Sequence, residues 1–418
     1  MKLGGSPSRL VVVDRPLVSI VTPSFNQARF IRETIESVLS QDYPHIEYII
    51  MDGASSDDTA EVVKPYLDRL TFVSEKDRGQ SHAINKGFAR ARGEIVAWLN
   101  SDDVFLPGAV SRAVDAFRAN PQAAVVYGEG YQIDIDGRLK SRFPHTRAFD
   151  LWSLVFFSDY ILQQTVFFRK SALDVVGPVR EDLHYVMDWD ILIRLGKRFD
   201  FVYVPEYMGS LREYGEAKTF VGGKKRIREI RDVLREHTGL QFPPGYIVYG
   251  LDTYSQIWAG WFDRWPAPLQ PVARVLRGLT LRLAHQVIGR VATGCQGRYA
   301  DGWIGKSASF MLRSGNGEVL INGVVPDVDD LRGQRITVKC EGRTCYEKEL
   351  RAGEFSLRFG ARQRGNDGVT FQVAFKKTFV PAEHAGSTDQ RRLGAIVRDF
   401  RWAGELPPSS GEVRLPPS

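Results

Sequence analysis

The sequence predicts an α/β protein with a doubly wound, mostly parallel mixed sheet of the Rossmann-like kind, followed by a helical linker and a C-terminal β-sandwich. Over about the first 120 residues, short apolar runs alternate with amphipathic segments. This is the pattern of repeated βα units and therefore of a parallel sheet. Aromatic-rich segments broken by prolines follow, and from residue 299 onwards short alternating runs are separated by Gly, Asp and Pro. Such runs are typical of a sandwich.

The first hundred residues contain four predicted strands with helices between them. Apolar, β-branched runs predict the strands at residues 17–23, 46–53, 70–75 and 94–100. The first helix is expected to be capped by Asn26 and to end before residue 41. Two further helices are predicted over residues 55–67 and 81–93, and Gly93 is expected to end the second.

After about residue 120 the pattern changes. We predict a hairpin over residues 123–143, then a strand and a helix over 163–177. A helix over 185–199 places Asp190 and Arg194 one turn apart, where they can pair. The following segments are predicted as a strand pair over 200–215, a charged helix over 224–238 and aromatic-rich helices up to residue 298.

Composition is that of an ordinary globular protein. The chain has 418 residues, 43% hydrophobic and 25% charged, which is enough for two or three hydrophobic cores. The first apolar run is too short for a signal peptide, and no uncharged apolar segment approaches the ~20 residues that span a bilayer. The three cysteines suit a reducing compartment, and we expect a cytoplasmic protein. Packed free thiols and a bridge between Cys340 and Cys345 across a hairpin both stay open.

Polar side chains gather where the predicted parallel strands end. Asp52 and the adjacent pair Asp102 and Asp103 each follow a strand, as does the turn from Pro23 to Asn26. Ligands of doubly wound sheets bind at these ends. Two neighbouring carboxylates repel each other, so the pair suits a divalent cation completed by water and phosphates. A solvated turn that caps the next helix is the alternative. Neither a P-loop nor a dinucleotide-binding glycine motif is present.

Residues 18–59 and 75–110 resemble family 2 inverting glycosyltransferases of the GT-A fold, and the resemblance extends over roughly residues 16–220. It implies a nucleotide-sugar donor, linked to UDP, GDP or dTDP, and a divalent metal, Mn²⁺ or Mg²⁺. It also implies direct displacement at the anomeric carbon. The implied acceptor is a glycan, with a lipid-linked glycan as one open form, in the synthesis of a bacterial surface or cell-wall polysaccharide. No nucleic acid partner is expected.

The resemblance also assigns roles to residues, position by position. Asp103 is expected to be the more direct metal ligand, with Asp102 on the ribose or sharing the ion. Asp188 is the expected base that takes the proton of the acceptor hydroxyl, and Asp190 is its main rival. The donor-binding residues are expected to be Thr22, Ser24, Asn26, Asp52, Asn85, Asp102 and Gln163.

One position departs from the family pattern. Many members have Arg-x-His near the end of the domain, where the histidine completes the metal shell, but here Tyr214 stands in its place. A phenol is a poor ligand for Mg²⁺ or Mn²⁺, so we expect weaker metal binding or a shell completed by water. Lys218 is an alternative group to neutralise the leaving diphosphate. Packing for Tyr214, and a satisfied buried amide for Gln163, are the structural alternatives.

Four segments are predicted: a GT-A domain at 1–238, a partly basic helical linker at 239–298, a β-sandwich at 299–405 and a disordered tail at 406–418. Residues 271–291 have an apolar helical face opposite arginines. This pattern suits a helix in an anionic membrane interface, with peripheral association at the inner face of the cell membrane, and equally a linker helix packed on the catalytic domain. The apolar side is Val272, Val275, Leu276, Leu279, Leu283 and Val287.

Two competing functions stay open. The first is a non-catalytic carbohydrate-binding protein on a degenerate GT-A scaffold, in which the sandwich binds the glycan. The second is a sugar nucleotidylyltransferase, which would need a Gly/Lys-rich phosphate loop after the first strand. The segment at that position, TPSFNQARF, contains no such loop.

Overall fold

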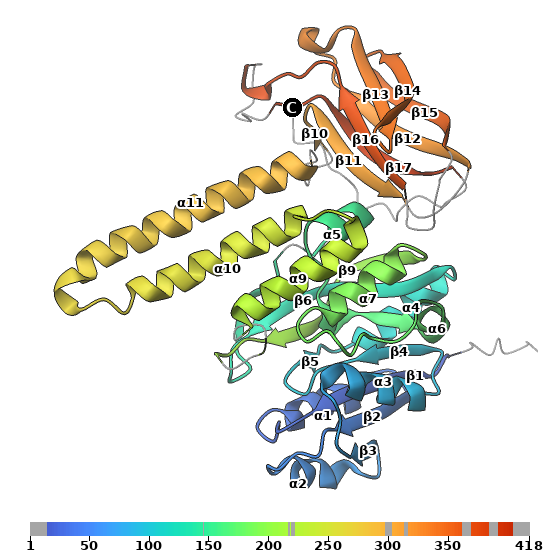
Figure 1. Ribbon diagram of the computed structural model, residues 1–418. Helices are drawn as coiled ribbons and strands as arrows, with labels where there is room; N and C mark the ends of the chain where they lie inside the picture. Colours follow the sequence, from blue (N-terminus) through green and yellow to red (C-terminus); the bar gives the residue numbers. More distant parts are fainter. Residues whose placement is uncertain are drawn as a thin grey trace, which may run out of the picture.

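The computed structural model describes residues 15–144, 146–215, 218, 222–296, 303–312, 317–361, 369–383 and 392–403, and of residues 285–296 and 382 it describes the backbone alone. Three bodies follow one another along the chain. These are an α/β domain, a long helical hairpin and an antiparallel β domain (Figure 1). The predicted tail at 406–418 lies outside the described residues.

A mixed sheet of nine strands forms the described part of the α/β domain, in the order β3-β2-β1-β4-β8-β6-β9-β5, with β7 on β6. The strands β3, β2, β1 and β4 are parallel, and so are β6 and β9, whereas β8 is antiparallel to both of its neighbours. The strands are β1 (Val18–Ser24), β2 (Ile46–Asp52), β3 (Thr71–Ser74), β4 (Ile95–Trp98), β5 (Val104–Phe105), β6 (Ala123–Ile133), β7 (Leu139–Arg142), β8 (Phe167–Arg169) and β9 (Asp200–Arg212).

Helices cover both faces of this sheet, because successive strand residues point to opposite sides. Ile20 and Ile50 belong to one buried cluster with α1 and α4, and Val21 and Ile49 to another with α3, α5, α6, α7 and α9. The predicted α/β architecture, a doubly wound mixed sheet, is confirmed. The helices are α1 (Ile31–Leu39), α2 (Thr59–Val63), α3 (Gln80–Arg90), α4 (Ala109–Ala119), α5 (Leu151–Phe156), α6 (Lys170–Val176), α7 (Met187–Gly196) and α9 (Gly223–Thr238).

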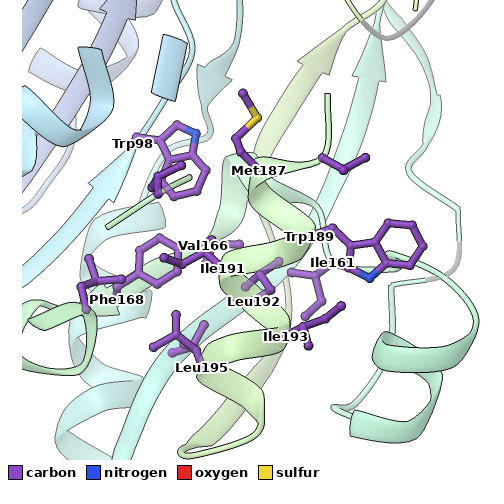
Figure 2. Packing of buried hydrophobic residues seen from close by; sticks show 14 of the residues in the cluster. Trp98, Ile161, Val166, Phe168, Met187, Trp189, Ile191, Leu192, Ile193 and Leu195 are labelled. Atoms are coloured by element: carbon purple, nitrogen blue, oxygen red, sulfur yellow. The ribbon is translucent and has the colours of Figure 1, made fainter. Parts of the chain in front are cut away.

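Helix α7 is buried on nearly every side. Figure 2 shows its side chains, among them Ile191 and Leu195, in one cluster with Trp98 of β4 and Phe168 of β8. The rings of Trp98 and Phe168 stack with their centroids 5.4 Å apart. All residues of α7 are buried except Asp188 and Arg194. The core therefore fixes the start of α7, where Asp188 stands.

The predicted strand pair over residues 200–215 is wrong, because β9 is one strand of 13 residues. Its pairing with β6 passes from Val204 directly to Tyr207, so Pro205 falls in a bulge and not in a turn. A bulge is one of the few places where a sheet tolerates proline.

After α9, the helices α10 (Pro244–Phe262) and α11 (Gln270–Gln296) form a hairpin joined by a short 3₁₀ turn, Ala267–Leu269. Figure 1 shows that the hairpin extends well beyond the α/β domain and that α11 returns to the β domain. No helix within the described ranges is long and apolar enough to cross a bilayer. The sequence-based domain boundaries stay predictions.

The C-terminal domain consists of two four-stranded antiparallel sheets, β10-β17-β12-β15 and β11-β16-β13-β14, around a shared core. This confirms the predicted β-sandwich. Cys340 and Cys345 lie on the β13–β14 hairpin as free thiols, so the bridge between them is not formed. The strands are β10 (Trp303–Ile304), β11 (Ser307–Leu312), β12 (Gly317–Val325), β13 (Gln334–Cys340), β14 (Arg343–Leu350), β15 (Gly353–Ala361), β16 (Val369–Phe375) and β17 (Ala395–Trp402).

Candidate active site

Asp103, in the turn after β4, is a buried structural anchor. Its Oδ1 accepts the backbone N–H of Arg212 at 2.9 Å, and its Oδ2 accepts Gln164 Nε2 at 2.6 Å and Asn100 Nδ2 at 3.0 Å. Burial, together with the charge of Asp102, raises the pKa of Asp103 to about 7. Both carboxylate oxygens are thus engaged within the protein.

Asp102 is half-buried, and its carboxylate is the more accessible of the pair. Its Oδ2 accepts the hydroxyl proton of Tyr214 at 2.8 Å, and the Tyr214 ring lies 5.0 Å from that of Phe30. Tyr214 therefore does more than pack. Burial raises the pKa of Asp102. The sequence predicts Asp103 as the more direct metal ligand, and this stays a prediction, although Asp102 has the more accessible carboxylate.

Arg212 holds the acidic turn in place. Its side chain is almost fully buried, and Nε donates to the carbonyl of Asp102 at 2.8 Å. The guanidinium also donates to the carbonyls of Asp134 and Ile135 and forms an ion pair with Glu33. Arg212 ties together the turn, β9 and α1. It was not predicted from the sequence, although it is the arginine of the segment that resembles Arg-x-His.

Asn26 is not a helix cap, because α1 begins at Ile31. Its φ is +54°, a left-handed conformation that asparagine tolerates better than most residues. Its N–H donates to Ser55 Oγ at 2.8 Å, and its Oδ1 accepts the N–H of Ser56 at 2.9 Å. Asn26 therefore joins the loops that follow β1 and β2.

Asp52 shapes the end of β2. It is buried, and its carboxylate accepts the N–H and hydroxyl of Ser55 and the hydroxyl of Ser74. These bonds connect the ends of β2 and β3. The structure thus brings Asp52 to the predicted edge of the sheet, but with its oxygens hydrogen-bonded to serines.

The end of β1 carries two side chains that are suited to a ligand. Ser24 Oγ is buried and has no hydrogen-bond partner among the residues that the structure describes. A buried polar group without a partner is uncommon and often marks a ligand or water. The ring of Phe25 is 60% exposed, and an aromatic face of this kind can stack on a nucleobase. Ser24 was predicted, whereas Phe25 was not.

Three further predicted donor-binding residues have internal partners. The Thr22 hydroxyl is 3.1 Å from the hydroxyl of Tyr48 in the core. The Asn85 amide donates to the carbonyl of Val179 at 2.8 Å and accepts its N–H at 3.0 Å. Gln163 Nε2 donates to the last carbonyl of β4 at 2.8 Å. The contacts of all three are structural, and their roles in donor binding stay predictions.

A second pair of carboxyl groups lies at the start of α7 and in the loop after α5. Asp188 accepts the N–H of Trp189 at 2.9 Å, and Asp159 accepts the N–H of Ile161 at 3.3 Å. Both are half-buried, and burial raises the pKa of each. The charge of Asp188 raises the pKa of Asp159 further, while Arg226 lowers both. Asp159 was not predicted from the sequence.

Asp190 belongs to a different, buried network. It pairs with Arg194 at 2.8 Å, as the spacing predicts, and with His237 at 3.0 Å and Arg180 at 3.6 Å. Burial alone would raise the pKa of Asp190, but the hydrogen bond from His237 and the charge of Arg194 hold it below its usual value. Asp190 is therefore poorly suited to accept a proton.

A chain of hydrogen bonds leads from Lys218 through Gln80 and Asn100 to Asp103. Lys218 Nζ donates to Gln80 Oε1 at 2.8 Å, and Gln80 Nε2 donates to Asn100 Oδ1 at 2.7 Å. Burial lowers the pKa of Lys218 to about 8, and the charges of Asp188 and Glu229 act in the opposite direction. Lys218 is thus linked to the turn after β4 by hydrogen bonds and to Asp188 at the start of α7 by charge alone.

Residues 19–174, from β1 through α6, match the family model described as Glycosyl transferase family 2. Over these residues the N-terminal domain is similar to family 2 glycosyltransferases. The match includes the Asp102–Asp103 turn and Asp159, whereas Asp188 and Lys218 lie beyond its end.

Similar proteins share this domain over part of their length. An uncharacterised glycosyltransferase of Rickettsia prowazekii is 28% identical over 42% of this chain and 57% of its own. The chondroitin synthase of Escherichia coli is 29% identical over 45% of this chain and 28% of its own. The chain thus spans little more than half of the first relative. A mannosyltransferase of Pyrobaculum calidifontis, solved with GDP-Man and Mn²⁺, is 18% identical with a TM-score of 0.45, over 67% of this chain and 85% of its own.

The N-terminal domain offers an incomplete set of metal ligands. No group of three or more His, Cys, Asp or Glu side chains that could hold an ion occurs in the described ranges. Burial and the charge of Asp102 raise the pKa of Tyr214, so the phenol stays protonated at neutral pH and supplies no anionic ligand. Asp102 fits Mg²⁺ or Mn²⁺ only where phosphate oxygens and water complete the shell.

Proposed function

We propose that this domain transfers a sugar from a nucleotide-sugar donor to the hydroxyl of a glycan acceptor, with inversion at the anomeric carbon. The observation that carries the proposal is the position of Lys218, which is hydrogen-bonded through Gln80 and Asn100 to the acidic turn and interacts by charge with the half-buried Asp188. The acidic turn suits a diphosphate, and Asp188 suits the removal of a proton.

The donor binds at the ends of β1, β2 and β4. The exposed ring of Phe25 stacks on the base, and the unpaired hydroxyl of Ser24 bonds to the donor. Asp102 would hold Mn²⁺ or Mg²⁺ on the diphosphate side of the donor. When bound there, the ion supplies positive charge that stabilises the leaving nucleoside diphosphate.

Asp188 is the base. As the acceptor oxygen forms its bond to the anomeric carbon, the bond to the diphosphate breaks on the opposite face, and the hydroxyl proton passes to the Asp188 carboxylate. Burial raises the pKa of Asp188, so the carboxylate is a stronger base than an exposed aspartate. The charge of Asp188 in turn raises the pKa of Asp159.

Lys218 places a cation on the donor side of the same site. Its Nζ is fixed by the hydrogen bond to Gln80, which in turn is bonded to Asn100 of the acidic turn. A fixed cation stabilises the charge that develops on the leaving group. This role does not depend on Tyr214, which replaces the histidine of the family pattern.

We place the acceptor among the glycans of bacterial surface or cell-wall polysaccharides. The similarity to a chondroitin synthase over the N-terminal domain supports a polysaccharide acceptor. The sequence itself favours no particular sugar.

A donor screen tests the proposal. Thermal unfolding of the full chain is measured with UDP-, GDP- and dTDP-sugars, each with Mn²⁺ or Mg²⁺, and sugar transfer is then assayed with the stabilising donor. Asp188→Ala is expected to keep the donor-induced shift in Tm and to lose transfer. Asp174→Asn, an exposed acid on α6, serves as the matched control. Stabilisation by no donor, or glycan binding without any donor requirement, would contradict the proposal.

A further inference from the structure

The exposed apolar side chains of the described chain are concentrated on one element, the α10–α11 hairpin and the segment that leads into it. Twelve of the sixteen large exposed hydrophobic residues in the described ranges lie between residues 240 and 283. A contiguous apolar patch on a soluble surface usually marks an interaction site. The twelve are Leu240, Phe242, Ile247, Tyr254, Ile257, Trp258, Trp261, Leu269, Val272, Val275, Leu279 and Leu283.

The two helices pack through a narrow seam of small or fully buried side chains. On α10 the seam contains Ala259 and Phe262, and on α11 it contains Ala273, all less than 10% exposed. Trp258 and Trp261, in contrast, are 60% and 56% exposed. The apolar side chains that face solvent therefore do not contribute to the packing of the two helices against each other.

The exposed residues of the two helices share one face of the hairpin. Successive helix residues are about 100° apart. Trp258 and Trp261 on α10 therefore lie about a quarter-turn from the seam, and Val272 and Leu283 on α11 lie about a quarter-turn from it in the same rotational sense. In an antiparallel pair this places both rows on the same side. Figure 1 shows that the connecting end of the hairpin projects beyond the α/β domain and the sandwich.

The charge of this element has a single sign over its second half. Residues 264–296 contain five arginines and no Asp or Glu. Arg277 pairs with Asp263 at 3.4 Å, whereas Arg274 and Arg282 are exposed on α11. A second copy of this face would bring arginines against arginines, while an anionic lipid surface would complement them.

We propose that the α10–α11 face docks on an anionic lipid surface. Trp258 and Trp261 enter the headgroup region with the aliphatic row of α11, and Arg282, which is exposed beside that row, contacts lipid phosphates. Tryptophan at the interface and arginine beside an apolar row are the two features of such surfaces. Of the two sequence-based alternatives for residues 271–291, the exposed row of α11 does not suit a helix packed on the catalytic domain. This docking is independent of the transferase chemistry.

Vesicle binding of the full chain tests the proposal. Flotation is measured with phosphatidylcholine vesicles, with and without phosphatidylglycerol, at low and high salt. Quenching of tryptophan fluorescence by brominated lipid reports insertion, since Trp98, Trp152, Trp189 and Trp402 are buried. We expect binding that requires phosphatidylglycerol, weakens with salt and quenches the exposed tryptophans.

Three variants separate the contributions. Trp258→Ser with Trp261→Ser is expected to lower vesicle affinity by on the order of tenfold or more, and Arg282→Gln by about fivefold. Leu139→Ser with Val175→Ser removes side chains that are 64% and 55% exposed but lie outside the hairpin, and should change nothing. Circular dichroism and the Tm show whether each variant is folded.

Three results would overturn the proposal. These are no vesicle binding by the wild type, equal loss of binding in the Leu139/Val175 control, and a dimer in sedimentation velocity that the tryptophan substitutions dissociate. The last would assign the face to a second copy of the chain. Donor-induced thermal shifts in solution are expected to stay unchanged in all hairpin variants, so failure of docking and failure of the proposed transferase activity are distinguishable.

Discussion

The two carboxylate pairs of the site differ in how many donors compensate their charge. Asp103 accepts three hydrogen bonds and is linked to Arg212, which leaves its neighbour Asp102 as the accessible member. Asp159 and Asp188 accept one backbone N–H each within the described structure, and the charge of Asp188 raises the pKa of Asp159. The first pair thus consists of a hydrogen-bonded anchor and a more accessible carboxylate, whereas the second stays a pair of interacting acids.

The difference indicates how the protein assigns tasks to chemically identical side chains. Hydrogen bonds and cations stabilise the charged form of a carboxyl group and lower its pKa, whereas burial raises it, and for Asp103 burial and the charge of Asp102 outweigh three donors. Asp190, surrounded by Arg194, His237 and Arg180, is the extreme of the first kind. A carboxylate that must take up a proton should belong to the second kind, as Asp188 does.

The sharpest test of this comparison exchanges Asp188 and Asp190 for asparagine in turn. Asp188→Asn is expected to lower kcat by about 10³-fold, because the base is lost, while donor-induced stabilisation persists. Asp190→Asn leaves two arginines with fewer counter-charges in a buried network and should cost about 3–5 kcal/mol of unfolding free energy. Initial rates and urea unfolding measure the two effects. If Asp190→Asn lowered kcat as much as Asp188→Asn in the folded protein, the assignment of the base would be wrong.

Asparagine at Asp102 and at Asp103 tests the division of the first pair. Asp102→Asn should weaken metal-dependent donor binding by about 10- to 100-fold with little change in stability. Asp103→Asn turns an NH₂ group towards N–H donors and should cost about 1–3 kcal/mol of unfolding free energy. Donor titrations with Mn²⁺ and urea unfolding separate the two. The opposite result, with donor affinity lost mainly in Asp103→Asn, would support the ranking made from the sequence.

Asp103→Asn should also change how the free energy of unfolding depends on pH. The pKa of Asp103 rises from 3.8 to about 7 on folding, so the folded protein binds this proton more tightly than the unfolded chain. The contribution of Asp103 to stability is therefore greatest below pH 3.8 and is lost as the pH rises towards 7. Unfolding curves between pH 4 and 7 should show this decline in the wild type and a smaller one in Asp103→Asn.

Much of the fold could be predicted from local pattern, because the first strands are buried on both faces and separated by amphipathic helices. Ile20 and Val21, adjacent in β1, already belong to different cores. The course of β9 could not be predicted in this way. Pro205 suggests an interruption, and only pairing with the long strand β6 converts it into a bulge. That pairing joins residues far apart in the sequence, which local pattern does not contain.

The residues of the candidate site likewise fall into those that local sequence predicts and those that depend on contacts between distant parts of the chain. Asp52, Asp102 and Asp188 were found from strand ends and family resemblance, which are local features of the sequence. Arg212 and Asp159 were missed because their roles come from packing: the Arg212 N–H that binds Asp103 lies 109 residues away along the chain. The sequence also could not show that Asp102 and Asp103 differ in their hydrogen bonding, because Gln164 and Arg212, which donate to Asp103, come from distant elements.

Lys218 links the two pairs, and its titration should appear in the rate. Because burial lowers the pKa of Lys218 to about 8, its charge is present below that pH and is lost above it. We therefore expect kcat/KM, which reports the free enzyme, to fall about tenfold per pH unit above pH 8. Lys218→Arg should move this decline to higher pH, since arginine stays charged. An unchanged alkaline limb in Lys218→Arg would exclude Lys218 as its source.

The smallest effect is expected at Tyr214, and it concerns how firmly Asp102 holds a metal. The Tyr214 hydroxyl donates to Asp102 Oδ2 at 2.8 Å and so competes with a cation for that oxygen. Tyr214→His removes this hydroxyl proton and adds an imidazole, a good ligand for Mn²⁺. The affinity for Mn²⁺ in the presence of the nucleotide-sugar donor should therefore rise about fivefold to tenfold.

Tyr214→Phe is the matched control, because it removes the hydroxyl and adds no ligand. Calorimetric titration with Mn²⁺ in the presence of donor compares the three proteins. A higher affinity for Mn²⁺ in Tyr214→His but not in Tyr214→Phe indicates that the imidazole binds the ion. An equal increase in both variants indicates that the Tyr214 hydroxyl merely competes with the ion for Asp102. If neither variant changes the affinity, Asp102 is not the residue that binds the ion.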